Sequence, residues 1–323
     1  MVWTRLDATN KTDAETERDA RMADFHGNRE QYLQNALDLP VEAFWAKYEA
    51  WAREHRRDAT LKIQTTFWKA LIEHSGAYRM SQITRITLEE FKTAQLGRWS
   101  KASVNSALKD IRAIFNRAIK QGWYSGPNPT VGIERYTITR KLPEPHNEAE
   151  LNKLLEYAAK VGQVAEWTVL LGGWAGLRRK EITAARWEWF HFDGQEPIVE
   201  IKAFEGFDLK DSEERTIAMS RRVFDALYPH RKESGFLFES GHKNEGKHRY
   251  RFEPRRQLFA ALQAAGLSTD DAFQRLRVSF ACLHAMAGTP IYTLSKWLGH
   301  SSVTVTERYY VRAKGYSKDI DAF

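Results

Sequence analysis

The chain has 323 residues, of which 42% are hydrophobic and 12% aromatic, and its formal net charge is +7. That length predicts two domains, and the apolar content excludes a wholly disordered chain. No apolar run approaches 18 residues, so we expect no membrane span. The single cysteine, Cys282, excludes an internal disulfide and a cysteine-rich zinc site, and we expect a cytoplasmic protein. The basic surplus is compatible with nucleic-acid binding but is weak evidence for it.

Residues 1–38 are polar and charged and lack the apolar segment of a signal peptide, so we expect a solvated extension with one helix around Arg18–Leu37. Residues 40–135 then show helical periodicity and predict a compact, all-helical domain. Thr87 has the spacing of a helix cap, with Glu90 three residues later, and Ser100 opens a longer helix that ends before Gly122.

The proline-containing segment 136–145 predicts a linker, and residues 146–323 form a second domain. Asn147 is placed to cap the first helix of that domain. Residues Ile198–Ile201 and Glu214–Met219 alternate in polarity and predict two strands, whereas helical patterns resume after Arg221. The expected fold is therefore mainly α, with a small antiparallel β-sheet in the second domain.

Two segments of the second domain carry the most information: Ala175–Ile182 (AGLRRKEI) and Gln274–Val311. Together they resemble the tyrosine recombinase (phage integrase) family, and the resemblance extends over both domains. It implies a SAM-like helical core-binding domain in front of a catalytic domain. The family's motifs fall on the following residues: the two arginines on Arg178 and Arg277, a supporting acid on Glu181, the late histidine on His300 within Leu298–Ser302, and the nucleophilic tyrosine on Tyr309, nine residues further on.

The resemblance also implies a catalytic lysine in the β-hairpin, five residues before an arginine. Lys210 meets that spacing through Arg215, and Lys202 is the competing choice. Tyr310 competes with Tyr309, and since neighbouring helical residues point about 100° apart, at most one of them is the nucleophile.

These residue types suit one reaction. A tyrosine that attacks a phosphodiester forms a 3′-phosphotyrosyl bond, so the bond energy is conserved and no ATP is needed. Two guanidiniums bind the phosphate oxygens as the charge on them grows, and the family implies Lys210 as the acid for the leaving 5′ oxygen and His300 as a hydrogen-bond partner of the phosphate. The resemblance thus implies a site-specific DNA recombinase that uses no metal and no cofactor.

The sequence departs from the family pattern at Gln274, where the family has histidine three residues before the second arginine, and at Val278. Glutamine can donate a hydrogen bond but cannot accept a proton at neutral pH. The general base is therefore left open between water, His300 and the phosphate itself.

The expected partners are double-stranded DNA and further copies of the chain, as a tetramer on two DNA sites. The polar face of the helix after Ser100 either contacts DNA or is only solvated. The basic segment Gly241–Gln257 is suited to contact the phosphates of DNA. The candidate DNA-binding residues are Lys101, Ser103, Asn105, Lys109, Lys243, Lys247, Arg249 and Arg251.

Two alternatives use the same fold. One is a type IB topoisomerase, which relaxes supercoils without recombining two sites, and the other is a catalytically impaired relative that only binds DNA. Gln274 favours the second alternative, whereas the presence of both arginines, the lysine and the tyrosine argues against it. The chain has no phosphate-binding glycine motif and no clustered metal ligands, so small-molecule metabolism has no support.

Overall fold

The structure is a computed structural model that describes residues 14–20, 22, 38–139, 143–209, 214–239 and 253–314. The chain divides into two compact units, Met1–Arg140 and Lys141–Phe323, and the division falls inside the segment expected to be a linker. Five of the candidate residues lie outside the described residues: Lys210, Lys243, Lys247, Arg249 and Arg251. Within the extension, residues 14–20 are helical, and most of the helix expected around Arg18–Leu37 also lies outside the described part.

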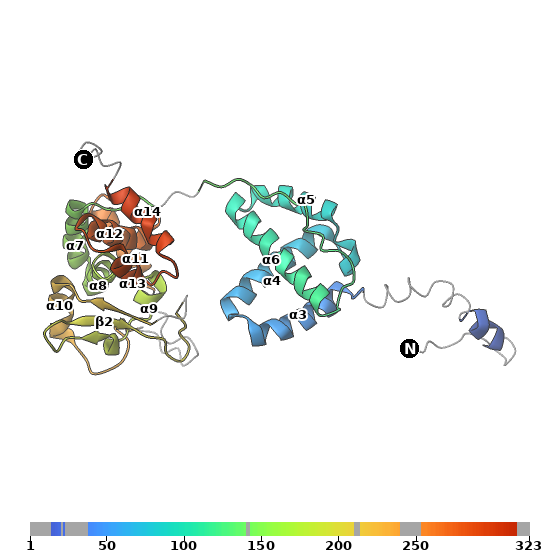
Figure 1. Ribbon diagram of the computed structural model, residues 1–323, viewed down its shortest axis with the longest axis horizontal. Coiled ribbons are helices and arrows are strands. Elements are labelled where there is room, and N and C mark those ends of the chain that lie inside the picture. Colours follow the sequence, from blue (N-terminus) through green and yellow to red (C-terminus); the bar gives the residue numbers. More distant parts are fainter. Residues whose placement is uncertain are drawn as a thin grey trace. The chain divides into compact units, whose positions relative to one another are not determined.

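The first unit is all-helical, as expected. Helix α4 packs against α3, α5 and α6 (Figure 1). The apolar faces of these helices share one core that is rich in aromatic rings. Ser100 caps α6 by accepting a hydrogen bond from the backbone N–H of Ser103, and this satisfies one of the donors that a helix start leaves without a partner. The α-helices of this unit within residues 38–139 are α3 (Val41–His55), α4 (Asp58–Ser75), α5 (Arg85–Ala94) and α6 (Lys101–Lys120).

Helix α5 begins earlier than its sequence pattern indicates. Its cap is Thr84, whose hydroxyl accepts from the N–H of Thr87, while the Thr87 hydroxyl accepts from the N–H of Thr84. The prediction that Thr87 is the cap was therefore wrong. The two reciprocal hydrogen bonds between Thr84 and Thr87 make Thr84 the N-cap, so the helix starts at Arg85.

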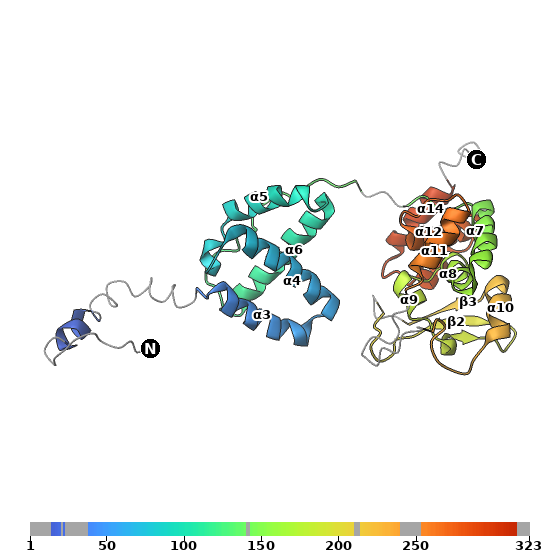
Figure 2. The same ribbon diagram turned by 180° about the vertical axis from the view of Figure 1, so that it is seen from behind.

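The second unit is mostly helical, with the central helix α8 in contact with α7, α10, α11 and α12. Eight of the eleven residues of α8 are buried, which explains why its sequence is apolar on every side. Figures 1 and 2 both place the sheet and α10 on one side of α8 and helices α7, α12 and α14 on the other. The helices are α7 (Glu148–Val161), α8 (Gln163–Gly173), α9 (Arg179–Thr183), α10 (Arg221–Leu227), α11 (Arg255–Ala264), α12 (Ala272–Met286), α13 (Ile291–Leu298) and α14 (Val303–Lys314).

The small sheet is antiparallel, with the order β1-β2-β3. Strands β2 (Ile198–Ile201) and β3 (Arg215–Ala218) confirm the two predicted strands, and the register pairs Ile201 with Arg215. Strand β1 (Phe190–His191) has only two residues and was not predicted. Along β3 the side chains alternate between buried and exposed, so Arg215 points to the same side as buried Ile217.

Two further features bear on the second unit. Asn147 caps α7 as predicted, with Glu150 completing a capping box. None of the helices within the described ranges is both long and apolar enough to span a bilayer.

Candidate active site

The candidate site is built around the C-terminal end of α13. The helix ends at Leu298 because Gly299 adopts the left-handed conformation, with φ of 59°. The last carbonyl groups of a helix have no partner within the helix and carry partial negative charge. This end of α13 therefore offers acceptors that favour cations.

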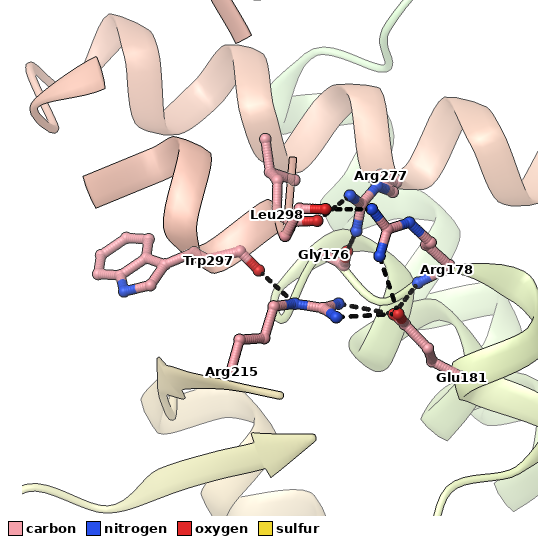
Figure 3. A network of polar contacts seen from close by, with 8 residues as sticks. Gly176, Arg178, Glu181, Arg215, Arg277, Trp297 and Leu298 are labelled. Carbon is pink, nitrogen blue, oxygen red and sulfur yellow. Dashed lines mark hydrogen bonds and ion pairs between the residues drawn. The ribbon is translucent and has the colours of Figure 1, made fainter. Parts of the chain in front are cut away.

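Three arginines from separate parts of the chain donate to three successive carbonyl groups at this end. Arg215 Nε donates to the Trp297 oxygen at 2.8 Å, Arg277 Nη2 donates to the Leu298 oxygen, and Arg178 Nη2 donates to the Gly299 oxygen. The three side chains come from β3, from α12 and from the residue before α9 (Figure 3). The end of α13 thus brings Arg178 and Arg277, which are 99 positions apart in the sequence numbering, to adjacent acceptors.

Arg178 is the N-cap of α9 and is held by Glu181. The Glu181 carboxylate accepts from the Arg178 backbone N–H at 2.7 Å and from Arg178 Nη1 at 3.2 Å. About a fifth of the Arg178 side chain (20%) stays exposed, whereas only 3% of the Glu181 side chain does. This agrees with the expectation that Glu181 supports Arg178 from below the surface.

Glu181 also forms a bidentate ion pair with Arg215, at 2.9 Å from Nη1 and 2.6 Å from Nη2 (Figure 3). Burial alone would raise the pKa of the Glu181 carboxyl, but the hydrogen bonds and charge of Arg215 outweigh it and hold that pKa at about 2. Glu181 is therefore a permanent carboxylate that is shared between two arginines.

Arg277 is more deeply buried than its half-polar surroundings in the sequence suggest. Its side chain donates to the carbonyl oxygen of Gly176 as well as to that of Leu298. Burial, and then the nearby charge of Arg178, lowers its pKa, while Glu181 acts in the opposite direction. Gly176 has φ of 64°, and a Cβ there would lie 2.6 Å from the Phe280 ring, so glycine is required where the loop passes Arg277.

His300 and Tyr309 form a stacked pair near Arg277 and Arg178. His300 Nδ1 lies 2.8 Å from the hydroxyl of buried Thr306, and its ring stacks on that of Tyr309, with centroids 5.8 Å apart. Tyr309 is only 4% exposed, and this burial raises the pKa of its phenol, although Arg277 and Arg178 both act to lower it. The phenol therefore lies within the field of both candidate arginines. The side chain of Tyr310 lies outside the described residues.

Two further candidates of this unit, Gln274 and Lys202, form no hydrogen bond or ion pair with the three arginines among the described residues. Gln274 is exposed on α12, three residues before Arg277. Lys202 is paired with Glu200 at 2.8 Å, an acid that also contacts His191 at 3.1 Å. The Lys202 ammonium thus has a surface partner of its own, whereas its competitor Lys210 is outside the described residues.

In the first unit, the four candidates on α6 differ from one another. Lys101 and Lys109 are exposed, and the Ser103 hydroxyl lies 3.0 Å from that of Ser100 within the helix cap. The Asn105 amide accepts from the backbone N–H of Tyr136 at 2.9 Å and donates to its carbonyl oxygen at 2.8 Å. Asn105 therefore binds the segment around Tyr136, which follows the helices of this unit, to α6.

Arg215 is the site residue that sequence reasoning missed. In the sequence, Arg215 was used only to find Lys210, which lies five residues before it. The alternation of β3 puts Arg215 on the buried side of the strand, and this could have identified it as a site residue. In the part of the chain that the structure describes, no three His, Cys, Asp or Glu side chains are grouped as metal ligands would be.

Known proteins resemble this chain in sequence and in fold. The profile of the Phage integrase family matches residues 146–315, which is more than half of the chain. An integrase of Streptomyces ambofaciens is 25% identical over 255 residues, which cover 69% of this chain and 65% of that protein. The chain thus spans slightly less than two thirds of that relative.

Solved structures show the same fold. The Tn1549 transposon integrase, in complex with transposon right end DNA, superimposes with a TM-score of 0.66 and 18% identity, over 84% of this chain and 95% of that one. A lambda integrase dimer bound to a core site also gives 0.66, with 16% identity over 93% and 88% of the two chains. The XerH site-specific recombinase gives 0.61, with 20% identity over 81% and 78%. The match of the family profile to the segment that carries the arginine cluster, His300 and Tyr309 establishes that this chain belongs to the phage integrase family of tyrosine recombinases.

Proposed function

We propose that this protein is a site-specific DNA recombinase that cuts and rejoins duplex DNA through a covalent 3′-phosphotyrosine, with Tyr309 as the nucleophile. The observation that carries the proposal is the convergence of Arg178 and Arg277 on adjacent carbonyl groups, with the Tyr309 phenol close enough for both to lower its pKa. Two fixed guanidiniums can bind the phosphate of a phosphotyrosyl transfer, and the tyrosine supplies the nucleophile.

The reaction follows from that arrangement. The Tyr309 oxygen attacks the phosphorus, the bond from phosphorus to the 5′ oxygen breaks, and a 3′-phosphotyrosyl bond forms. The tyrosine proton passes to a base, and the 5′ oxygen takes up a proton as it leaves. A 5′ hydroxyl of the partner strand then attacks the phosphotyrosine, which restores the phosphodiester and frees Tyr309. Each preorganised arginine contributes about 3–4 kcal/mol to binding of the transition state.

The proton transfers are assigned as follows. Lys210 protonates the leaving 5′ oxygen. Because burial raises the pKa of Tyr309, the phenol needs a base at neutral pH, and Gln274 cannot serve as one. His300 stacks on the phenol ring and is the protein group best placed to bind the phosphate or to receive the proton, with water and the phosphate itself as the other acceptors.

We propose contacts with the DNA backbone for the exposed Lys101 and Lys109, for Ser103 at the start of α6, and for Lys243, Lys247, Arg249 and Arg251. The helical domain, residues 40–135, would bind the core site, and the catalytic domain, residues 146–323, would bind the scissile phosphate. Strand exchange between two sites requires four active subunits, so the working assembly is a tetramer in the cytoplasm. Support comes from the lambda integrase structure, in which a dimer is bound to one core site.

A trapping experiment tests the proposal. The protein is incubated with a pool of nicked duplexes that tile the DNA on either side of its gene, since a nick lets the cleaved fragment escape and leaves the enzyme attached. We expect an adduct on a denaturing gel with the wild type and none with Tyr309→Phe. Relaxation of supercoiled DNA without joining of two sites would instead favour a topoisomerase. Specific DNA binding without any adduct would favour a binding-only relative.

A further inference from the structure

We propose that Arg215 is a positioning residue, which sets the place of Arg178 through Glu181 and fixes the end of α13 through the Trp297 carbonyl. This inference rests on the proposed function, because its consequence is a defect in the cleavage step. Arg215 would not touch the DNA itself: only 5% of its side chain is exposed, compared with 20% for Arg178.

The contacts of Arg215 use the planar shape of its side chain. Its two Nη atoms bind both oxygens of Glu181, and its Nε binds the Trp297 oxygen in a different direction (Figure 3). A lysine ammonium also has three donors, but they radiate from one atom and cannot reproduce this fork. Arg215 therefore ties three elements together: β3, which carries it, α9, which carries Glu181, and the end of α13.

The charges explain why this link controls Arg178. Glu181 is a permanent carboxylate in a buried place, and it has two cationic hydrogen-bond partners, Arg215 and Arg178. The contact to Arg215, at 2.6 Å, is shorter than the contact to Arg178, at 3.2 Å. If Arg215 is removed, a buried carboxylate loses its stronger partner and draws the Arg178 guanidinium toward itself. Arg178 then moves away from the position in which it binds a phosphate.

Gly299 supplies an independent observation. A Cβ at this position would lie 2.9 Å from Arg215 Cδ and 3.2 Å from its Nε, so the Arg215 side chain runs directly against the backbone of the turn. That same turn offers the Gly299 oxygen to Arg178 and leads directly to His300. Arg215 thus contacts the turn that binds Arg178 and that leads to His300.

The decisive variants separate the charge of Arg215 from the shape of its side chain. Arg215→Lys keeps the charge but loses the planar fork of donors, and Arg215→Met loses both. The control is Arg186→Lys, since Arg186 pairs with Glu188 at 2.9 Å and packs on Phe204 and Phe236 instead of on the arginine cluster.

The first readout is the single-turnover rate of adduct formation on the trapped duplex, measured beside the Kd of each variant in a Tyr309→Phe background. Because a misplacement of about 1 Å can cost about 100-fold in rate, we expect Arg215→Lys to slow adduct formation by about 100-fold. Its Kd and the rate of Arg186→Lys should stay within about threefold of the wild type. We expect Arg215→Met to be at least as slow as Arg215→Lys, because it leaves the buried Glu181 carboxylate without the charge of Arg215. A normal rate for Arg215→Lys, or a loss of DNA binding in parallel with the loss of rate, would overturn the inference.

The second readout does not depend on catalysis. In the full chain with ¹⁵N-labelled arginine, the Nε–Hε resonance of Arg178 is assigned through Arg178→Lys. Arg215→Lys should shift this resonance and Arg186→Lys should leave it in place; an unmoved Arg178 signal in Arg215→Lys would contradict the positioning role. If the wild type forms no adduct with any duplex, the proposed function fails, yet this spectrum still decides whether Arg215 positions Arg178.

Discussion

The imidazole of His300 and the phenol of Tyr309 lie with their ring planes 16° apart and their centroids 5.8 Å apart. The stacked pair spans the turn between α13 and α14, and the Thr306 hydroxyl, on the first half of α14, lies 2.8 Å from His300 Nδ1. This hydrogen bond fixes the orientation of the imidazole, and because a hydroxyl both donates and accepts, it is compatible with either tautomer of the ring.

Thr306→Val should therefore impair the reaction without unfolding the site. Valine has nearly the shape of threonine but lacks the hydroxyl, so the imidazole loses a contact that orients it toward the phosphate. We expect adduct formation to slow by about tenfold, which corresponds to an increase of about 1.4 kcal/mol in the activation free energy, while DNA binding is unchanged. Thr304→Val, at an exposed position on the same helix, is the matched control. Equal rates for the two variants would show that the Thr306 hydroxyl has no part in orienting His300.

Gly299→Ala should destabilise the second unit by more than the same change elsewhere. The left-handed conformation alone costs a non-glycine residue about 1–2 kcal/mol, and the new Cβ would also press on Arg215. Gly266→Ala separates the two effects, since Gly266 has φ of 70° with nothing within 4 Å of a Cβ. We expect Gly299→Ala to lower the free energy of unfolding, measured with urea, by at least about 1 kcal/mol more than Gly266→Ala. Equal losses would mean that Arg215 moves aside at little cost.

His146 should make stability fall as the pH is lowered. Its ring is buried, and burial, with the charge of Arg275, lowers the pKa of the ring from 6.5 to about 4, although Glu150 acts to raise it. Between these two pKa values the His146 ring is protonated in the unfolded chain but neutral in the folded chain. The free energy of unfolding is therefore highest above about pH 6.5 and falls as the pH drops toward about 4.

We expect the free energy of unfolding of the wild type to fall by up to about 2 kcal/mol more than that of His146→Leu between about pH 7.5 and about pH 5. Urea unfolding at the two pH values measures this difference. Parallel behaviour of the two proteins would contradict the assignment of the pH effect to His146.

Lys101 and Lys109 should contribute to DNA affinity without affecting the choice of sequence. If each contacts one phosphate, removing it lowers the slope of log K against log salt by about one unit. Lys101→Ala and Lys109→Ala, tested on the trapped duplex and on an unrelated duplex, should weaken both complexes equally. An unchanged slope for either variant would place that lysine on the merely solvated face of α6.

Local patterns in the sequence predicted much of this fold. Ser100 and Asn147 cap their helices as expected, and the alternation in β2 and β3 marked both strands. Thr84 was missed because Thr87 fits the same pattern three residues later. Short-range periodicity and capping chemistry were sufficient for these elements because both partners lie within one turn or one strand.

Long-range pairing could not be predicted in this way. Glu181 and Arg215 belong to different elements and are 34 residues apart, and the residues near each of them give no indication that the two side chains pair. Asn105 looked like a polar surface residue, yet its amide binds the backbone of Tyr136, 31 residues away. The sequence could not predict that the three carbonyl groups at the end of α13 bind arginines, because every residue has a backbone carbonyl group.

The most direct test of the account is to identify the amino acid that carries the DNA. The trapped adduct would be digested with protease and nuclease, and the peptide with a residual nucleotide located by mass spectrometry. We predict that the nucleotide is attached to Tyr309, and that Tyr310→Phe still forms the adduct. Attachment to Tyr310, or to any residue other than Tyr309, would contradict the assignment of the stacked and buried tyrosine as the nucleophile.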